Sequence, residues 1–159
     1  MQIDILCVGK IKEKYLNDAI DEYAKRLGRY CKVSFCRVAD EKTPDGCPEA
    51  ENRRIRKTEG ERLLRAVREQ DYVIALAIEG ENPDSEEMAR HLSNLAAHGK
   101  SSLVFVIGGS LGLSEEVLSR ADWLLSFSRM TFPHQLMQVI LLEQIYRSFR
   151  IIHHEPYHK

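Results

Sequence analysis

The sequence has 159 residues, of which 43% are hydrophobic and 30% are charged, as is ordinary for one soluble globular domain spanning residues 1–159. Its 23 basic and 24 acidic residues give a formal charge of −1, which argues against a general nucleic-acid-binding protein but not against an enzyme that touches RNA through one local patch. No apolar run approaches the ~18 residues of a membrane span, and the opening MQIDILCVGK is too short for a signal peptide, so we expect a cytoplasmic protein with no membrane partner.

The N-terminal half predicts two strands and two helices. Residues 2–8 and 32–39 alternate between apolar and polar positions and are predicted strands. Apolar residues recur at helical spacing over 13–28, and Gly28 is a suitable helix end. A loop with two prolines separates the second strand from a charged helix predicted over 49–69, whose apolar side is thin until Leu63.

The C-terminal half continues the alternation of strands and helices. The run YVIALAI has the continuous apolar character of a strand that is buried on both faces. The predicted elements of this half are a strand over 72–78, a helix from 85 to about 99, a strand over 102–107, a turn over 108–112, a short helix opening at 114, a strand over 122–127 and a long helix over 134–150. This order predicts an α/β fold with a mostly parallel sheet that is covered by helices.

The four cysteines give no indication of a metal site. They form no CxxC pair, and zinc sites normally draw on closely spaced Cys or His pairs. We interpret Cys7 as a buried strand residue and Cys31, Cys36 and Cys47 as free thiols.

A glycine-rich turn is the first candidate ligand site. Gly108, Gly109 and Gly112 follow a predicted buried strand and precede a helix, where open α/β sheets place their ligands. The pattern is neither GxGxxG nor GxxxxGK[ST], so it lacks the dinucleotide and Walker fingerprints. A plain tight turn between strand and helix explains it equally well.

The segment from Ser126 to Gln135 is the second candidate. It combines hydroxyls, an arginine, a histidine and large apolar side chains between a strand and a helix, which is the mixture that a small-molecule pocket requires. Pro133 before His134 is also ordinary chemistry for the start of a helix, and that is the alternative role for His134.

The helix over 134–150 is apolar around most of its circumference, which is typical of a helix buried on several sides. In so short a chain we expect a second subunit to provide part of that cover, with packing inside one core as the alternative. The tail after it, IIHHEPYHK, carries three histidines near a carboxylate, which is one pattern for a metal site. However, Pro156 interrupts the run and no HExxH helix surrounds it. The tail suits phosphate contact and base stacking, or else it is a disordered terminus.

The basic cluster Arg53, Arg54, Arg56 and Lys57 has two interpretations. Most such runs are solvated helix faces. A supporting contact with RNA is the other possibility.

Several of these segments together resemble the ribosomal RNA large-subunit methyltransferase H family. The resemblance rests on ILCVGKIKEKYL, the strand at 72–80, FVIGGSLGL, LSFSRMTFPHQL, EQIYRSF and the terminal PYHK, which run through the whole chain in order. It implies an S-adenosylmethionine-dependent enzyme that methylates N3 of a pseudouridine in 23S rRNA, and the neutral charge favours the ribosome as its target. It also implies the SPOUT fold, a parallel sheet flanked by helices with a C-terminal deep trefoil knot, working as a homodimer.

The resemblance further assigns residues to the site. Those that would contact S-adenosylmethionine are Leu76, Gly108, Phe127, Ser128, Arg129, Met130, Thr131 and Phe132. Those on the substrate side are Arg147, Tyr157 and His158, with His134 nearby. We expect Arg147 to serve as a charge-stabilising cation or phosphate anchor and His158, from either subunit, as the base. No metal is implied.

Two other functions remain open at this point. A non-catalytic ribosome-assembly factor would keep the fold without the chemistry. A nucleotide-binding protein of the flavodoxin kind is disfavoured because the phosphate fingerprint is missing.

Overall fold

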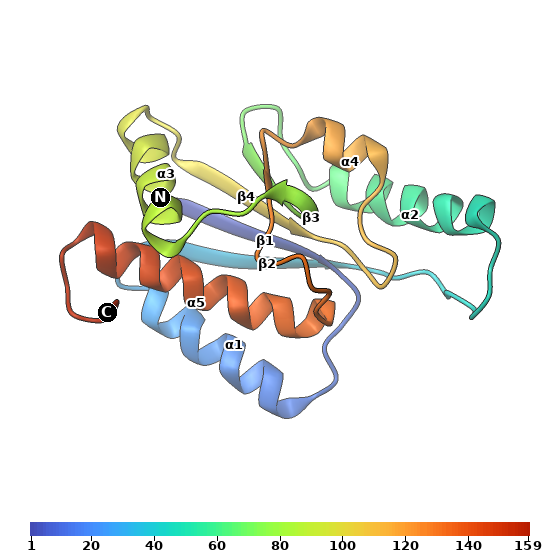
Figure 1. The fold of residues 1–159 in the computed structure, drawn as a ribbon, viewed down its shortest axis with the longest axis horizontal. Coiled ribbons are helices and arrows are strands. Elements are labelled where there is room, and N and C mark those ends of the chain that lie inside the picture. Colours follow the sequence, from blue (N-terminus) through green and yellow to red (C-terminus); the bar gives the residue numbers. More distant parts are fainter.

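The computed structural model describes residues 1–159 as a five-stranded sheet with helices on both faces (Figure 1). The elements in chain order are β1 (Gln2–Val8), α1 (Lys14–Leu27), β2 (Lys32–Val38), α2 (Glu49–Leu64), β3 (Tyr72–Glu81), α3 (Ser85–Ala97), β4 (Ser102–Ile107), α4 (Glu115–Arg120), β5 (Trp123–Leu125) and α5 (His134–Ile152). The alternating α/β order predicted from periodicity is confirmed.

The strands lie in the order β2-β1-β4-β3-β5, and every pairing is parallel. The predicted parallel sheet is therefore also confirmed. Because all strands run the same way, their carboxyl ends meet at one edge, where α/β proteins place their ligands.

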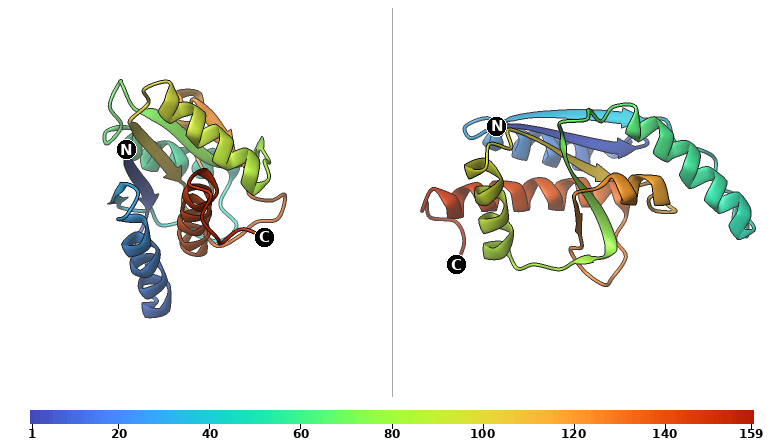
Figure 2. Two further views of the ribbon diagram at one scale, coloured as in Figure 1. Left: turned by 90° about the vertical axis from the view of Figure 1, so that its left-hand side faces the viewer. Right: turned by 90° about the horizontal axis from the view of Figure 1, so that it is seen from above.

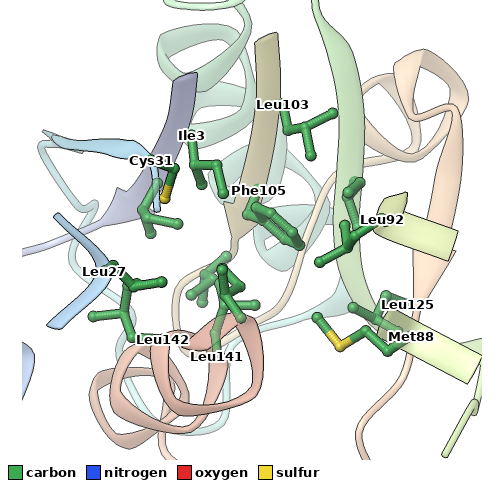
Figure 3. Close-up of a cluster of buried hydrophobic side chains, with 14 of the residues drawn as sticks. Ile3, Leu27, Cys31, Met88, Leu92, Leu103, Phe105, Leu125, Leu141 and Leu142 are labelled. Carbon is green, nitrogen blue, oxygen red and sulfur yellow. The ribbon is translucent and has the colours of Figure 1, made fainter. Parts of the chain in front are cut away.

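The larger core lies between the sheet and the helices α1, α3 and α5. Strands contribute Ile3, Phe105 and Leu125, which are fully buried, and α5 contributes Leu141 and Leu142 (Figure 3). Helix α5 packs against both α1 and α3, which explains part of its wide apolar circumference (Figure 2).

A smaller core lies on the opposite face beneath α2 and α4. It is made of seven buried residues: Leu6, Val8, Leu63, Val73, Val104, Val106 and Val117. With both faces covered, β4 is buried from Leu103 to Ile107, as its apolar sequence predicts. In β3 the double burial covers only Val73–Ala75, because the strand then runs on to Glu81 past the covering helices.

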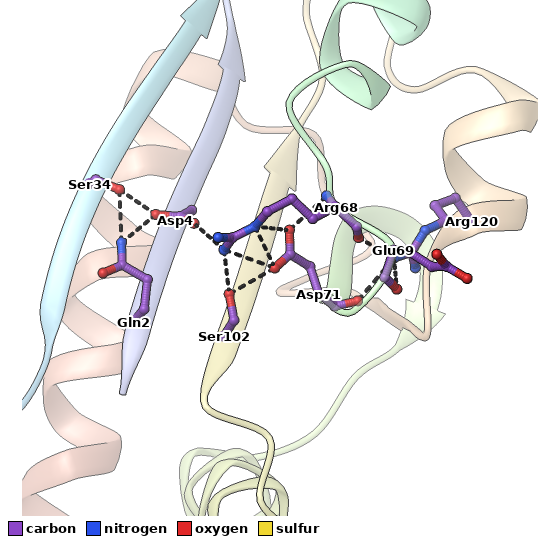
Figure 4. A network of polar contacts seen from close by, with 8 residues as sticks. All are labelled: Gln2, Asp4, Ser34, Arg68, Glu69, Asp71, Ser102 and Arg120. Atoms are coloured by element: carbon purple, nitrogen blue, oxygen red, sulfur yellow. Dashed lines mark hydrogen bonds and ion pairs between the residues drawn. The ribbon is translucent and has the colours of Figure 1, made fainter.

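A polar network closes the amino-terminal edge of the sheet (Figure 4). The Asp71 carboxylate accepts hydrogen bonds from the Arg68 amide (2.8 Å) and the Ser102 hydroxyl (2.8 Å), and Arg68 Nη2 lies 3.0 Å from Asp71 Oδ1. These contacts between Arg68 and Asp71 explain one difference from the predicted elements. Helix α2 ends at Leu64 rather than at 69, and the residues that follow form a turn that leads into β3.

The ends of other elements also differ from prediction, most clearly those of β3, β5 and α5. β3 continues beyond 78 to Glu81, β5 covers 123–125 instead of 122–127, and α5 extends to Ile152. At the end of β3, a Cβ on Gly80 would lie 2.6 Å from the Leu124 carbonyl carbon, so only glycine allows the two backbones this approach. No helix is long and apolar enough to cross a membrane.

Candidate active site

A cavity of about 1050 Å³ lies at the carboxyl edge of the sheet. The ends of β3 and β4, the glycine-rich turn, the segment 126–133 and the start of α5 form its walls, with α2 on one side. All but one of the residues predicted to contact the cofactor line it: Leu76, Gly108, Phe127, Ser128, Met130, Thr131 and Phe132. The exception is Arg129, which is exposed to solvent between the lining residues Ser128 and Met130.

The turn after β4 folds tightly back on itself. Gly108 is buried, and a Cβ there would lie 2.7 Å from the carbonyl carbon of Gly112. Gly112 has φ +83° and donates its N–H to the Gly109 carbonyl oxygen at 3.1 Å. Ser114 then caps α4 by accepting a hydrogen bond from the Val117 amide at 3.3 Å. The two interpretations of the glycines therefore coexist, since the tight turn is also a cavity wall.

Hydrogen bonds hold the segment after β5 in place. The Ser126 amide donates to the Glu81 carbonyl oxygen at 2.7 Å, and Asn82 Nδ2 donates to the Ser126 carbonyl oxygen at 2.8 Å. Within the segment, the Ser128 hydroxyl accepts from the Met130 amide at 2.9 Å. The large side chains that follow remain open to solvent, with Met130 73% exposed and Phe132 37% exposed.

His134 begins α5 and lines the same cavity. Burial lowers the pKa of its imidazole, and the nearby negative charge of Asp40 only partly opposes that shift. A helix N-terminus also disfavours a cation. The imidazole is therefore neutral at pH 7 and able to accept a proton.

The chemistry of the cavity suits a mid-sized cofactor. Its volume matches that of small-molecule sites, about 300–1,000 Å³, and apolar walls alternate with hydroxyls and backbone amides. The structure contains no group of three or more His, Cys, Asp or Glu side chains placed to hold a metal ion.

The other predicted substrate residues gather elsewhere, around Glu143 of α5. Arg147 Nη2 lies 2.5 Å from Glu143 Oε1, and the Tyr157 hydroxyl donates to the same oxygen at 3.0 Å. The Arg147 guanidinium stacks over the Tyr157 ring at 4.7 Å and lies 3.3 Å from His158 Nδ1. None of these residues lines the cavity, because thirteen residues of helix, about 20 Å, separate Arg147 from His134.

The C-terminal tail is tied to the body of the protein rather than disordered. Glu155 accepts hydrogen bonds from Arg29 (3.0 Å), Tyr30 and Arg150. Tyr157 packs edge-on against Tyr146. The tail histidines, which suggested a metal site as one alternative, belong to no such cluster.

Comparison with known proteins agrees with this architecture. The family model described as "Predicted SPOUT methyltransferase" matches residues 1–158. Proteins named ribosomal RNA large subunit methyltransferase H are 60% identical in Bifidobacterium animalis subsp. lactis, 58% in Clostridium novyi and 57% in Clostridioides difficile, each over the full length of both chains. The chain belongs to the SPOUT methyltransferases. Within them it belongs to the large-subunit methyltransferase H family, which confirms the resemblance seen in its motifs.

Solved structures support the fold of this SPOUT protein at low sequence identity. A probable methylase family protein from Haemophilus influenzae superposes with a TM-score of 0.52 at 14% identity, covering 99% of this chain and 70% of that one. A probable methyltransferase from Bordetella pertussis gives 0.52 at 13% identity, covering 92% of this chain and 95% of that one.

The structure of this family member adds residues to the site that sequence patterns did not assign to it. Arg53, Arg56 and Lys57 of α2 line the cavity, although the sequence showed them only as a basic cluster. Glu59 does not line the cavity but is buried behind the glycine-rich turn, against Gly109, and its carboxylate accepts a hydrogen bond from the Glu41 amide at 3.0 Å. Burial raises the pKa of Glu59. No sequence signal marks Glu59, because an acidic residue in a charged helix is expected to be exposed.

Proposed function

We propose that this chain transfers a methyl group from S-adenosylmethionine to N3 of a pseudouridine in 23S rRNA, acting on the ribosome in the cytoplasm, with residues 1–159 as one catalytic domain. One observation carries the proposal. The cavity at the carboxyl edge of the sheet gathers the predicted cofactor residues, from Leu76 on β3 to Phe132 before α5, in a chain of the methyltransferase H family. Arg129 stays a predicted cofactor contact through its backbone or through movement of its exposed side chain.

The proposed cofactor site lies where two distant segments cross. The backbone of β5 approaches Gly80. The Ser126 amide donates a hydrogen bond to the Glu81 carbonyl, and the Ser126 carbonyl accepts one from the Asn82 side chain. We propose that this crossing is part of the deep trefoil knot expected of the SPOUT fold. The knot would hold Leu76, Gly108 and the segment 127–132 at fixed positions around the cofactor.

The residues of this cavity fit S-adenosylmethionine, which when bound supplies an electrophilic methyl group on a sulfonium. Leu76 and Phe127 provide apolar walls, and the turn at Gly108 allows close approach of the backbone. Because methyl transfer is a displacement in line with the bond that breaks, the contribution expected from these residues is mainly positioning.

Transfer to N3 also requires a base, because the N3 proton must leave as the N–C bond forms. His134 is neutral and lines the cavity, so it is one proposed acceptor. His158 of the partner subunit is the other. Tyr157 is excluded from this role, because burial and its bond to Glu143 raise the pKa of its hydroxyl to about 12. Arg147 would stabilise negative charge on the flanking carbonyls or anchor a phosphate.

A homodimer would bring the two groups of residues together. Within one chain the cavity lies at the start of α5, whereas the Arg147–Tyr157–His158 cluster lies further along the helix, where the tail folds back on it. Three exposed apolar side chains line the cavity, Ile78, Met130 and Phe132, and a fourth, Leu136, follows in the first turn of α5. A second copy that covered them would complete the burial of α5 and place its tail beside the cavity.

Methyl transfer from labelled S-adenosylmethionine to ribosomes from cells that lack this protein tests the proposal. Digestion and mass spectrometry of the rRNA nucleosides should show one methylated pseudouridine, in 23S rRNA. Label in another nucleoside, or none, would contradict the proposal. Calorimetry tests the alternative of a non-catalytic assembly factor, since such a factor should show no saturable heat with S-adenosylmethionine.

A further inference from the structure

The four cations of the basic cluster on α2, Arg53, Arg54, Arg56 and Lys57, fall into two pairs with different surroundings. Arg54 Nη2 lies 2.5 Å from Glu51 Oε1, and Arg56 Nη2 lies 2.5 Å from Glu49 Oε1. These two guanidinium groups are neutralised within the helix. Arg53 and Lys57 are exposed, and neither forms an ion pair or a side-chain hydrogen bond.

The two unpaired cations share one face of the helix, and that face points toward the cavity. Residues 53, 57 and 60 are spaced four and three apart, so they lie one above the other. The face of Gly60 is pressed against Ser114, where a Cβ would lie 2.3 Å from the Ser114 hydroxyl oxygen. Arg53 and Lys57 line the cavity one and two turns further out, along the part of α2 that projects beyond the sheet (Figures 1 and 2).

The charges around these cations limit what they can bind. Three glutamates, Glu79, Glu115 and Glu116, line the same cavity. An anion is therefore favoured only beside Arg53 and Lys57, on the side of the cavity that α2 forms. With a net charge of −1 the chain has no overall basic excess, so individual cations beside the cavity matter for contact with RNA phosphates. Exposed, flexible cations beside a concave site are typical contacts for the phosphates of a polynucleotide.

We propose that Arg53 and Lys57 bind the phosphate backbone of the rRNA substrate beside the nucleotide that enters the cavity. The proposal rests on the proposed function. Arg54, on the same helix, is paired with Glu51 and takes no part. The position of the two cations on a projecting helix suits contact with a strand that passes over the cavity mouth.

A salt series tests this contact. The variant Arg53→Gln/Lys57→Gln is compared with Arg54→Gln/Arg65→Gln, which removes the same charge from exposed positions of α2 and its C-cap that do not line the cavity. KM and kcat for methyl transfer to ribosomes are measured against KCl concentration. For the first variant, KM at low salt should rise roughly tenfold and the slope of log(kcat/KM) against log[KCl] should fall by about 1 per cation, with kcat retained. The control variant should keep the wild-type slope.

Two further measurements separate the competing explanations. Calorimetry should give both variants wild-type affinity for S-adenosylmethionine. A loss confined to the first variant, with an unchanged slope, would mean that the cations hold the cofactor. Filter binding to protein-free 23S rRNA should show the same difference in slope. If the difference appears only with intact ribosomes, the contact is with a ribosomal protein and the proposal is wrong. If wild-type protein transfers no methyl group, the proposed function fails while the binding slopes still report on Arg53 and Lys57.

Discussion

His134 and Tyr157 differ in the proton chemistry that their surroundings allow. Burial at the start of α5 lowers the pKa of the His134 imidazole, so a free electron pair is available at pH 7. Burial and the bond to Glu143 both raise the pKa of the Tyr157 hydroxyl, to about 12, and so keep it protonated. Sequence placed both residues in the site, but only their environment separates a proton acceptor from a hydrogen-bond donor.

The substitution Gly108→Ala should distort the glycine-rich turn that forms one wall of the cavity. The added Cβ would meet the backbone of Gly112 at 2.7 Å, so the turn itself must shift. We expect a loss of about 1–3 kcal/mol in the free energy of unfolding and at least about tenfold weaker binding of S-adenosylmethionine. Urea denaturation and calorimetry measure the two effects.

Gly28→Ala is the matched control for Gly108. Gly28 has a right-handed helical conformation away from the cavity, and the nearest atom to an added Cβ is 3.3 Å distant. This variant should bind the cofactor normally. Equal affinity in the Gly108 variant would show that the turn is not a cofactor contact.

At the scale of elements, the link between α2 and β3 depends on one buried carboxylate. The Asp71 side chain is 1% exposed, while its partner Arg68 is 56% exposed. Burial alone would raise the pKa of Asp71, but hydrogen bonds from the Arg68 amide and guanidinium and from Ser102 outweigh it and lower the pKa below its ordinary value. The same bonds end α2 and bring the chain into β3 beside β4 (Figure 4).

Asp71→Asn should therefore destabilise the protein by about 2 kcal/mol at pH 7, because a charge-assisted network is lost. A lowered pKa in the folded state contributes stability above the ordinary carboxyl value of 3.8, and that stability disappears as the pH falls through the folded-state value. The difference between wild type and variant should shrink in acid. Urea denaturation between pH 7 and pH 3 measures it.

Asp18→Asn provides the comparison for Asp71. It removes an ion pair with Lys14 on α1 that is exposed to solvent, so we expect almost no change in the free energy of unfolding. A difference for Asp71 that stayed constant down to pH 3 would contradict the role of its ionised form.

At the scale of the whole molecule, the cavity lies at the start of α5, whereas the tail cluster lies around Glu143 and Arg147, further along the helix. The tail keeps a defined shape through Glu155 and its three partners. An ordered tail that lies far from its own cavity is what a site shared between two subunits requires.

Mixed dimers test that arrangement. One chain carries His134→Ala in the cavity, and the other lacks residues 157–159; each alone should be inactive while the truncated chain still binds S-adenosylmethionine. After the two are mixed and reassembled, random pairing leaves about a quarter of the sites with an intact cavity and an intact tail from the other chain. Methyl transfer should recover to about that level. No recovery, or full activity of the truncated chain alone, would show that the tail does not act across the interface.

The sequence by itself determined the order of elements, because periodicity is a local property. The run YVIALAI and the alternation at residues 2–8 predict strands without knowledge of their neighbours, and both are confirmed. The motif residues from Phe127 to His134 could be assigned to one site because they are consecutive. The end of α2 was wrong by five residues, since it depends on Asp71 capturing Arg68 from outside the helix.

Only the tertiary structure decided which side chains share a space. Leu76 and Gly108 meet the segment 127–132 because parallel strands end at one edge of the sheet. The basic cluster of α2 looked uniform in sequence, but the folded helix pairs Arg54 and Arg56 with glutamates and leaves Arg53 and Lys57 unpaired beside the cavity. The physical reason is the same in both cases: contacts between distant residues depend on how the chain packs, which local periodicity does not contain.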